Sequence, residues 1–169
     1  QRVLEQCRVA PGQRVLEIGC GWGGLAEMAL AERGASVTGV TLSTEQFAVA
    51  EQRAAERGLQ GKVRFLLQDY RDVTGRFDRI VSVGMFEHVG RAMLPAYFGK
   101  VWRLLAPGGL LMNHGITAGG TRNSQLGAGI GEFIERYIFP GGELLHLSHV
   151  LATMAEAISP LISRSLSRK

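Results

Sequence analysis

The sequence has few cysteines and no long apolar run, and each absence excludes a class of protein. Only two cysteines, Cys7 and Cys20, occur in 169 residues, which is too few for a disulfide framework and favours a reducing, cytoplasmic setting. No run of about 18 apolar residues is present, so no membrane-spanning helix is predicted. Residues 1–5 lack the features of a signal peptide.

Aromatic residues are also scarce, at 7% of the chain. They are not interleaved with basic residues in the pattern that binds single-stranded nucleic acid, so we expect no nucleic-acid partner. The formal net charge is +4, and the basic residues are scattered except for Arg164, Arg168 and Lys169 at the end. This charge fits either a mildly basic soluble protein or one attracted to anionic lipid, and the composition leaves both open.

Glycine, in contrast, is abundant, with 23 residues placed mostly where turns are needed. Between these turns, segments with the pattern of buried strands alternate with segments of helical periodicity. The predicted strands are 14–19, 36–41, 63–67, 77–84 and 110–116. The predicted helices are 23–33, closed by Gly34; one that Ser43 opens with capping-box spacing and Gly58 ends; 94–105, followed by a turn at 107–109; and 144–158, stopped by Pro160. Residues 118–131 are predicted to form a mobile loop or lid.

Five strands that alternate with helices predict an α/β fold, a doubly wound and mostly parallel sheet with helices on both faces. Such sheets bind ligands at the carboxyl ends of the strands, near the point where the strand order reverses. The polar or glycine-rich segments that follow the predicted strands are 19–24, 41–46, 69–70, 84–87 and 114–116. Their convergence on one rim predicts a ligand site there.

The first rim segment, Gly19-Cys20-Gly21-Trp22-Gly23-Gly24, follows a predicted strand and opens a predicted helix. Its glycines allow a sharp turn and a close approach of the backbone to a ligand. The segment also satisfies the G-x-G-x-x-G pattern, so a dinucleotide site is a real alternative. We interpret Trp22 as a packing residue that lines the pocket.

The second strand separates these alternatives. A dinucleotide site requires an acid at the tip of this strand to hold the ribose hydroxyls, whereas here the strand ends at Thr41. Thr41 and Gln46 can serve the ribose instead, with Glu45 as a nearby alternative. Asp69 can accept a hydrogen bond from an adenine amino group, and Tyr70 can cover the ring. The other interpretation of this last pair is an ordinary polar turn.

Several segments resemble the motifs of one enzyme family. Residues 15–24 resemble the first motif of class I methyltransferases, in the Trp-Gly-Gly form common in cyclopropane synthases. Residues 40–46, 68–72, 77–90 and 137–142 resemble further motifs of that group. From about residue 3 to residue 157, the chain is similar to the cyclopropane-fatty-acyl-phospholipid synthase and mycolic acid cyclopropane synthase family. The resemblance implies a Rossmann-like class I methyltransferase fold and S-adenosylmethionine as cofactor.

The resemblance and the rim positions together indicate which residues bind S-adenosylmethionine. They lie in the first three rim segments and at the end of the first strand. The predicted cofactor-binding residues are Glu17, Gly19, Cys20, Gly21, Trp22, Gly23, Thr41, Leu42, Ser43, Gln46, Asp69 and Tyr70. No metal site is predicted.

The resemblance also implies a reaction. The family transfers the methyl group of S-adenosylmethionine to a cis double bond of an unsaturated phospholipid acyl chain, and a base then removes a proton so that a cyclopropane ring closes. The resemblance implies that this base is a bound bicarbonate ion. Glu87, His114 and the backbone amide of Ile116 match three of the five groups that hold it. A peripheral position on the inner membrane face is expected from the same resemblance.

The sequence departs from the family at both ends. The family's bicarbonate-holding cysteine lies further upstream than Cys7, and its tyrosine lies in a stretch that this chain lacks. We therefore expect a methyltransferase core over 1–157 that is truncated at both ends and lacks the family's C-terminal strand pair. Residues 158–169 are expected to be a divergent tail with the composition of a disordered segment. A small-molecule methyltransferase and a catalytically inactive cofactor-binding fragment remain as alternatives.

Overall fold

A computed structural model describes the backbone of residues 2–118 and 144–166, and the side chains of these residues up to residue 157. The chain divides into two compact units. The first comprises residues 1–83 and 103–114, and the second comprises residues 84–102 and 115–169. Each unit is described by itself.

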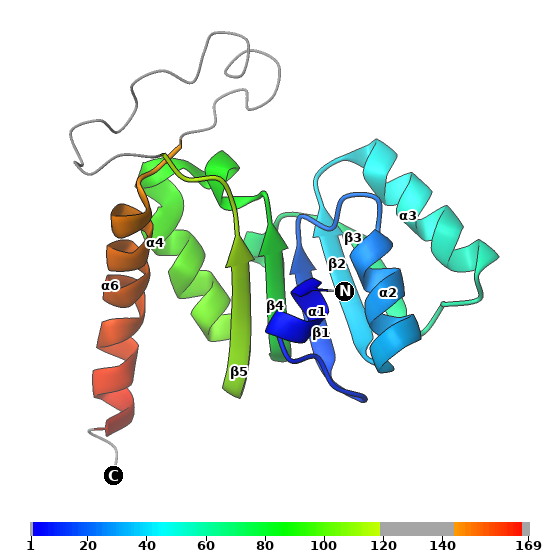
Figure 1. Ribbon diagram of the computed structural model, residues 1–169, viewed down its shortest axis with the longest axis horizontal. Coiled ribbons are helices and arrows are strands. Elements are labelled where there is room, and N and C mark those ends of the chain that lie inside the picture. Colours follow the sequence, from blue (N-terminus) through cyan, green and yellow to red (C-terminus); the bar gives the residue numbers. More distant parts are fainter. Residues whose placement is uncertain (1, 119–143, 167–169) are drawn as a thin grey trace, which may run out of the picture. The chain divides into compact units, whose positions relative to one another are not determined.

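The first unit is built on a five-stranded parallel sheet in the order β3-β2-β1-β4-β5 (Figure 1). Its strands are β1 Arg14–Ile18, β2 Ser36–Thr41, β3 Val63–Leu67, β4 Phe77–Val83 and β5 Leu105–His114. Its helices are α1 Arg2–Gln6, α2 Gly24–Arg33, α3 Thr44–Glu56 and the short 3-10 helix η1 Tyr70–Asp72. The strand order reverses between β1 and β4, so the predicted α/β fold with a parallel sheet is confirmed.

One face of this sheet carries the main core. The strands contribute large apolar side chains, whereas α2 and α3 contribute alanines, which allow the helix backbones to approach the sheet closely. The two helices lie side by side over β2 and β3 (Figure 1). The buried cluster includes Val15, Val37, Val63, Phe65 and Val81 from the strands, with Leu4, Ala26, Ala29, Ala50 and Ala54 from the helices. Each large apolar side chain buried in this way contributes roughly 1.5–3 kcal/mol.

The predicted helix ends in the first unit are largely confirmed. Gly34 closes α2 in the left-handed conformation: its N–H donates to the carbonyl of Leu30 at 2.9 Å, and the N–H of Ala35 donates to the carbonyl of Ala29 at 3.4 Å. Ser43 caps α3, because its hydroxyl accepts a hydrogen bond from the Gln46 N–H at 3.2 Å. The Gln46 side chain does not complete the capping box, because its Oε1 accepts from the Thr41 hydroxyl instead.

The fifth strand begins earlier than the sequence predicted. β5 starts at Leu105, which pairs with Phe77, and it therefore includes the 107–109 segment that was predicted as a turn. A register shift between Phe77 and Arg79 absorbs the extra residues, and Gly108 has φ +73°. The glycine allows the irregular backbone that such a bulge requires.

The second unit contains two long helices, α4 Phe86–Leu104 and α6 Leu147–Leu166. The last two residues of α4 belong to the first unit. α4 begins eight residues earlier than predicted. Its helical path is interrupted at Gly90, which has φ 71° and ψ 163°, and the helical periodicity in the sequence is weaker before this interruption. α6 continues beyond Pro160 to Leu166, so the predicted stop was wrong. A proline removes one backbone hydrogen bond and does not by itself end a helix.

The last described segment bears on the predicted domain boundary. Position 157 falls inside α6, and the backbone of residues 158–166 is helical. All but one residue of the predicted lid and the whole 137–142 motif lie outside the described residues.

The close approach at Gly39 yields a stability prediction. A β-carbon there would lie 2.8 Å from Phe65 Cδ1 and 2.9 Å from Cys20 Cβ. Gly39→Ala should therefore lower the free energy of unfolding in urea by about 1–3 kcal/mol through overpacking. Gly24→Ala is the control, because a β-carbon at Gly24 meets no atom within 4 Å. Equal stabilities of the two variants would contradict the packing described for β2.

Candidate active site

Three of the predicted rim segments meet at the carboxyl edge of the first unit's sheet. The N–H groups of Gly19 and Cys20 both donate to the carbonyl of Val40 at 3.0 Å, which joins the loop after β1 to the end of β2. The N–H of Gln68 donates to the carbonyl of Thr41 at 3.1 Å, which joins the segment after β3 to the same strand end. The predicted convergence of these segments is therefore present in the first unit.

The glycine-rich loop has a backbone that other residues would strain. Gly19, Gly21 and Gly23 have φ values of 76°, 52° and 80°. At Gly23 a β-carbon would also lie 2.6 Å from Phe65 Cζ, so the loop lies tightly against β3. The Trp22 side chain is 52% exposed. Its position as a lining residue of the pocket stays a prediction.

Glu17 is a buried acid next to this loop. Its side chain lies at the carboxyl end of β1, only 7% exposed, and burial raises its pKa to about 8. Its Oε2 has no hydrogen-bond partner among the described residues. A buried carboxylate oxygen in this state is suited to a ligand that brings a cation or an N–H donor. The nearby Cys20 thiol has its pKa raised to about 12 by burial and by the charge of Glu17, so it remains protonated.

The segment after β2 is ordered by its own side chains. The Thr41 hydroxyl donates to Gln46 Oε1 at 2.9 Å and accepts from the Ser43 N–H at 3.2 Å. The structure therefore brings together the two residues predicted to serve a ribose. Leu42, between them, is 71% exposed. Glu45 accepts from the Ser43 hydroxyl at 2.9 Å, and local hydrogen bonds lower its pKa.

Asp69 is already engaged with a neighbour. Its carboxylate accepts from the Arg71 backbone N–H at 2.8 Å and from the Arg71 guanidinium at 2.9 and 2.7 Å. These bonds and the charge of Arg71 lower the pKa of Asp69, while burial raises that of Tyr70. This arrangement matches the alternative interpretation, an ordinary polar turn, so an adenine amino group would have to share the carboxylate with Arg71.

Two of the predicted catalytic groups are in contact within the second unit. The Ile116 N–H donates to Glu87 Oε1 at 2.5 Å, and Glu87 is fully buried. Its Oε2 has no partner among the described residues. Gly115 allows this approach, because a β-carbon there would lie 2.8 Å from Glu87 Oε1 and would overlap Phe86. His114, one residue earlier, is the exposed last residue of β5 in the first unit.

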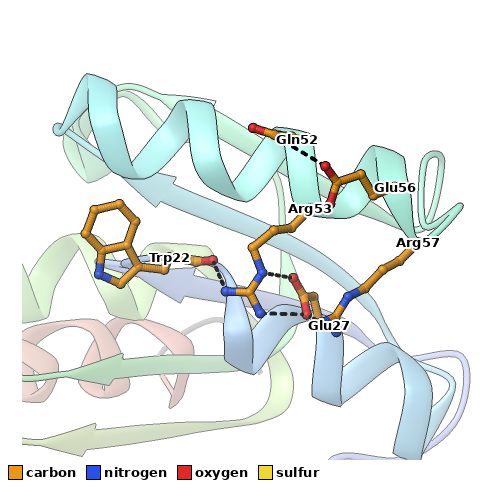
Figure 2. A network of polar contacts seen from close by, with 6 residues as sticks. All are labelled: Trp22, Glu27, Gln52, Arg53, Glu56 and Arg57. Atoms are coloured by element: carbon orange, nitrogen blue, oxygen red, sulfur yellow. Dashed lines mark hydrogen bonds and ion pairs between the residues drawn. The ribbon is translucent and has the colours of Figure 1, made fainter.

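The sequence analysis missed a charged network between α2 and α3. Glu27 is 5% exposed and forms ion pairs with Arg53 and Arg57. Figure 2 shows both arginines directed toward Glu27, with Arg53 also reaching the carbonyl of Trp22. The available signals were an acid among alanines in α2 and two arginines four residues apart at the end of α3.

Two features are absent from the part of the chain that the structure describes. Among residues 2–118 and 144–166, no three histidine, cysteine, aspartate or glutamate side chains are grouped so as to hold a metal ion. In the same ranges, no helix has the length and apolar character needed to cross a membrane.

Comparison with known proteins identifies the family. The model of the family described as mycolic acid cyclopropane synthetase matches residues 1–166. A probable fatty acid methyltransferase of Pseudomonas putida is 51% identical over 157 residues, which cover 92% of this chain and 40% of that protein. The cyclopropane-fatty-acyl-phospholipid synthase of Escherichia coli is 47% identical over 140 residues, which cover 83% of this chain and 34% of that protein.

A solved structure agrees with these matches. The mycolic acid cyclopropane synthase CmaA1, crystallised with SAH and CTAB, superposes with a TM-score of 0.77 at 30% identity. The superposition covers 94% of this chain and 57% of that one. The chain spans 40% of the length of the Pseudomonas putida relative and 34% of the length of the Escherichia coli relative. The sequence motifs, the sheet order and the match over residues 1–166 agree, and the chain belongs to the mycolic acid cyclopropane synthetase family.

Proposed function

We propose that this chain forms the cofactor-binding core of an S-adenosylmethionine-dependent methyltransferase that converts a cis double bond of an unsaturated phospholipid acyl chain into a cyclopropane ring. The observation that carries the cofactor assignment is Glu17, a buried acid with an unpartnered oxygen beside the glycine-rich loop. S-adenosylmethionine carries an ammonium group and a sulfonium, and a carboxylate in that position would compensate positive charge.

The other rim residues suit the rest of this cofactor. Thr41 and Gln46 hold one another in place at the end of β2, where a ribose would lie. Gly19, Cys20, Gly21, Trp22 and Gly23 form the close-approach loop, and Leu42 and Ser43 follow the end of β2. Asp69 and Tyr70 complete the adenine end, where Asp69 retains acceptor capacity beside Arg71. SAH bound to CmaA1 supports this assignment by analogy.

The lipid substrate is proposed from the relatives. Those of Pseudomonas putida and Escherichia coli are named for fatty acid or fatty-acyl-phospholipid chemistry. When bound, S-adenosylmethionine supplies a methyl carbon whose bond to sulfur breaks as it bonds to the alkene, and ring closure then releases one proton. We extend the proposal to peripheral contact with an unsaturated phospholipid surface.

Glu87, His114 and Ile116 are the residues proposed to manage that proton. When bound, bicarbonate would supply the base. The fit is partial, because the Ile116 N–H donates to Glu87 Oε1 and not to an open site. Glu87 Oε2 is buried and offers an acceptor that can orient an O–H donor. Burial strengthens such a hydrogen bond and excludes water from a reactive intermediate.

Calorimetric titration tests the cofactor assignment. S-adenosylmethionine and SAH should give saturable binding to the purified chain, whereas NAD should give none, because β2 ends at Thr41 without an acid. Binding of NAD in preference to S-adenosylmethionine would overturn the proposal.

The pKa of Glu17 predicts proton release on cofactor binding. Below pH 8 the folded chain holds a proton on Glu17, since burial raises the pKa from 4.5 to about 8. A cationic ligand favours the ionised form, so binding near pH 7 should release up to about one proton, measured by calorimetry in buffers of different ionisation enthalpy. Glu17→Gln should abolish the release and weaken binding by about tenfold or more.

The same residue affects stability without ligand. The folded chain binds more protons at Glu17 than the unfolded chain between pH 4.5 and about 8, so this contribution to the free energy of unfolding falls as pH rises through that window. Glu17→Gln should flatten the fall. Glu32→Gln, an exposed change in α2, is the control and should retain it. A pH profile unchanged by Glu17→Gln would contradict the assignment.

Two variants test the proton-handling residues. In the whole protein with vesicles of unsaturated phospholipid, Glu87→Gln and His114→Ala should lower kcat by about 10²–10⁴-fold while the Kd for S-adenosylmethionine stays within a few fold. The readout is acyl mass gain with loss of the double bond. Glu156→Gln, an exposed change in α6, is the control.

The outcomes of that assay separate the alternatives. Turnover that survives both variants would favour a methyltransferase that does not use these residues, such as a small-molecule enzyme. Cofactor binding by the parent with no lipid product would favour a cofactor-binding protein without this catalysis.

A further inference from the structure

Glu27 is a buried acid that two arginines compensate. It lies on α2 and is 5% exposed; Arg53 lies on α3, and Arg57 is the residue at the C-terminal cap of α3. Arg53 Nε lies 3.1 Å from Glu27 Oε1, and Arg57 Nη1 lies 2.5 Å from Glu27 Oε2. Removing charge from water is costly, so a buried carboxylate depends on partners of this kind. The ion pairs therefore join α2 to α3.

Of the two arginines, Arg53 reaches the glycine-rich loop. Arg53 Nη1 donates to the carbonyl oxygen of Trp22 at 3.4 Å, whereas Arg57 in this network donates to Glu27 (Figure 2). The two residues thus share a partner and differ in the loop contact. A comparison of Arg53 with Arg57 can therefore distinguish the effect of joining α2 to α3 from the effect of contacting the loop.

The loop contact fixes one peptide group. Trp22 lies between Gly21 and Gly23, and glycines on both sides leave its peptide planes free to rotate. The carbonyl of Trp22 is held by Arg53, and the N–H of Gly23 in the same peptide group donates to the Cys20 carbonyl at 3.0 Å. Both polar groups of this peptide are therefore bonded within the first unit.

The contact also links two parts of the proposed cofactor site. α3 follows Ser43 and carries Gln46 in its first turn, and both residues are proposed to lie near the ribose. Arg53 lies about 15 Å from Ser43 along the axis of the same helix. A helix of this length is a rigid element. Arg53 therefore connects the glycine-rich loop to the helix that presents the ribose-binding segment.

We infer that Arg53, held by Glu27, is a positioning residue that sets the glycine-rich loop in its cofactor-binding conformation. The inference rests on the proposed function, since it assigns the loop to S-adenosylmethionine. Arg53 touches the loop backbone and acts on the cofactor only through it. Its loss should therefore weaken ground-state binding more than it slows the chemical step.

The test compares Arg53→Met with Arg57→Met in the whole protein. Methionine keeps most of the aliphatic volume and removes the guanidinium. Both variants lose one ion-pair partner of Glu27 and should show similar decreases in Tm. Arg53→Met alone should raise the Kd for S-adenosylmethionine and SAH by about 5–20-fold, with a matching rise in KM and kcat within about twofold. Arg57→Met should bind as the parent does.

A third variant guards against failure to fold. Arg53→Lys keeps a positive charge for Glu27, but its single ammonium lacks the fork that reaches both Glu27 and Trp22. It should retain the parent's Tm more closely and still bind cofactor more weakly than Arg57→Met. Equal cofactor affinity in the position 53 and position 57 variants would overturn the inference while the proposed function stands. Lack of S-adenosylmethionine binding by the folded parent would overturn both.

Discussion

The rim of the first unit depends on one carbonyl group. The N–H groups of Gly19 and Cys20 both donate to the oxygen of Val40, so the backbone leaves β1 by turning across the end of β2. This turn requires glycine at position 19, and the same crowding leaves no space for a β-carbon at Gly39. Because the loop is fixed in this way, Glu17 stays at the end of β1 with little access to water.

Three buried glutamates show how the chain treats a carboxylate in different settings. Glu27 has two arginines, and Glu87 has the backbone N–H of Ile116 on one oxygen. Glu17 has an Oε2 without a partner among the described residues, and burial raises its pKa to about 8. The compensation within the described residues is greatest where the acid joins two helices. It is least at the switch point, where a ligand would complete it.

The sequence predicted the features that depend on local pattern. The bounds of β2 and β3 agree with their apolar runs, and Gly34 ends α2 as a left-handed cap does. The sequence did not predict the early start of β5, because this start depends on the pairing of Leu105 with Phe77 across the sheet. The Glu27 network was missed for the same reason, since Arg53 and Glu27 are 26 residues apart and meet only after folding.

Asp69 shows the limit of assigning a role from position alone. It follows β3 at the rim, as an adenine-binding acid would, yet its carboxylate is held by Arg71 two residues later. The guanidinium keeps the carboxylate ionised and fixes its plane, so a further donor would have to approach the remaining lone pairs. The interaction with Arg71 thus lowers the mobility of the acid before any ligand arrives. A residue that forms a polar turn in the free chain can in this way be oriented for binding by that same turn.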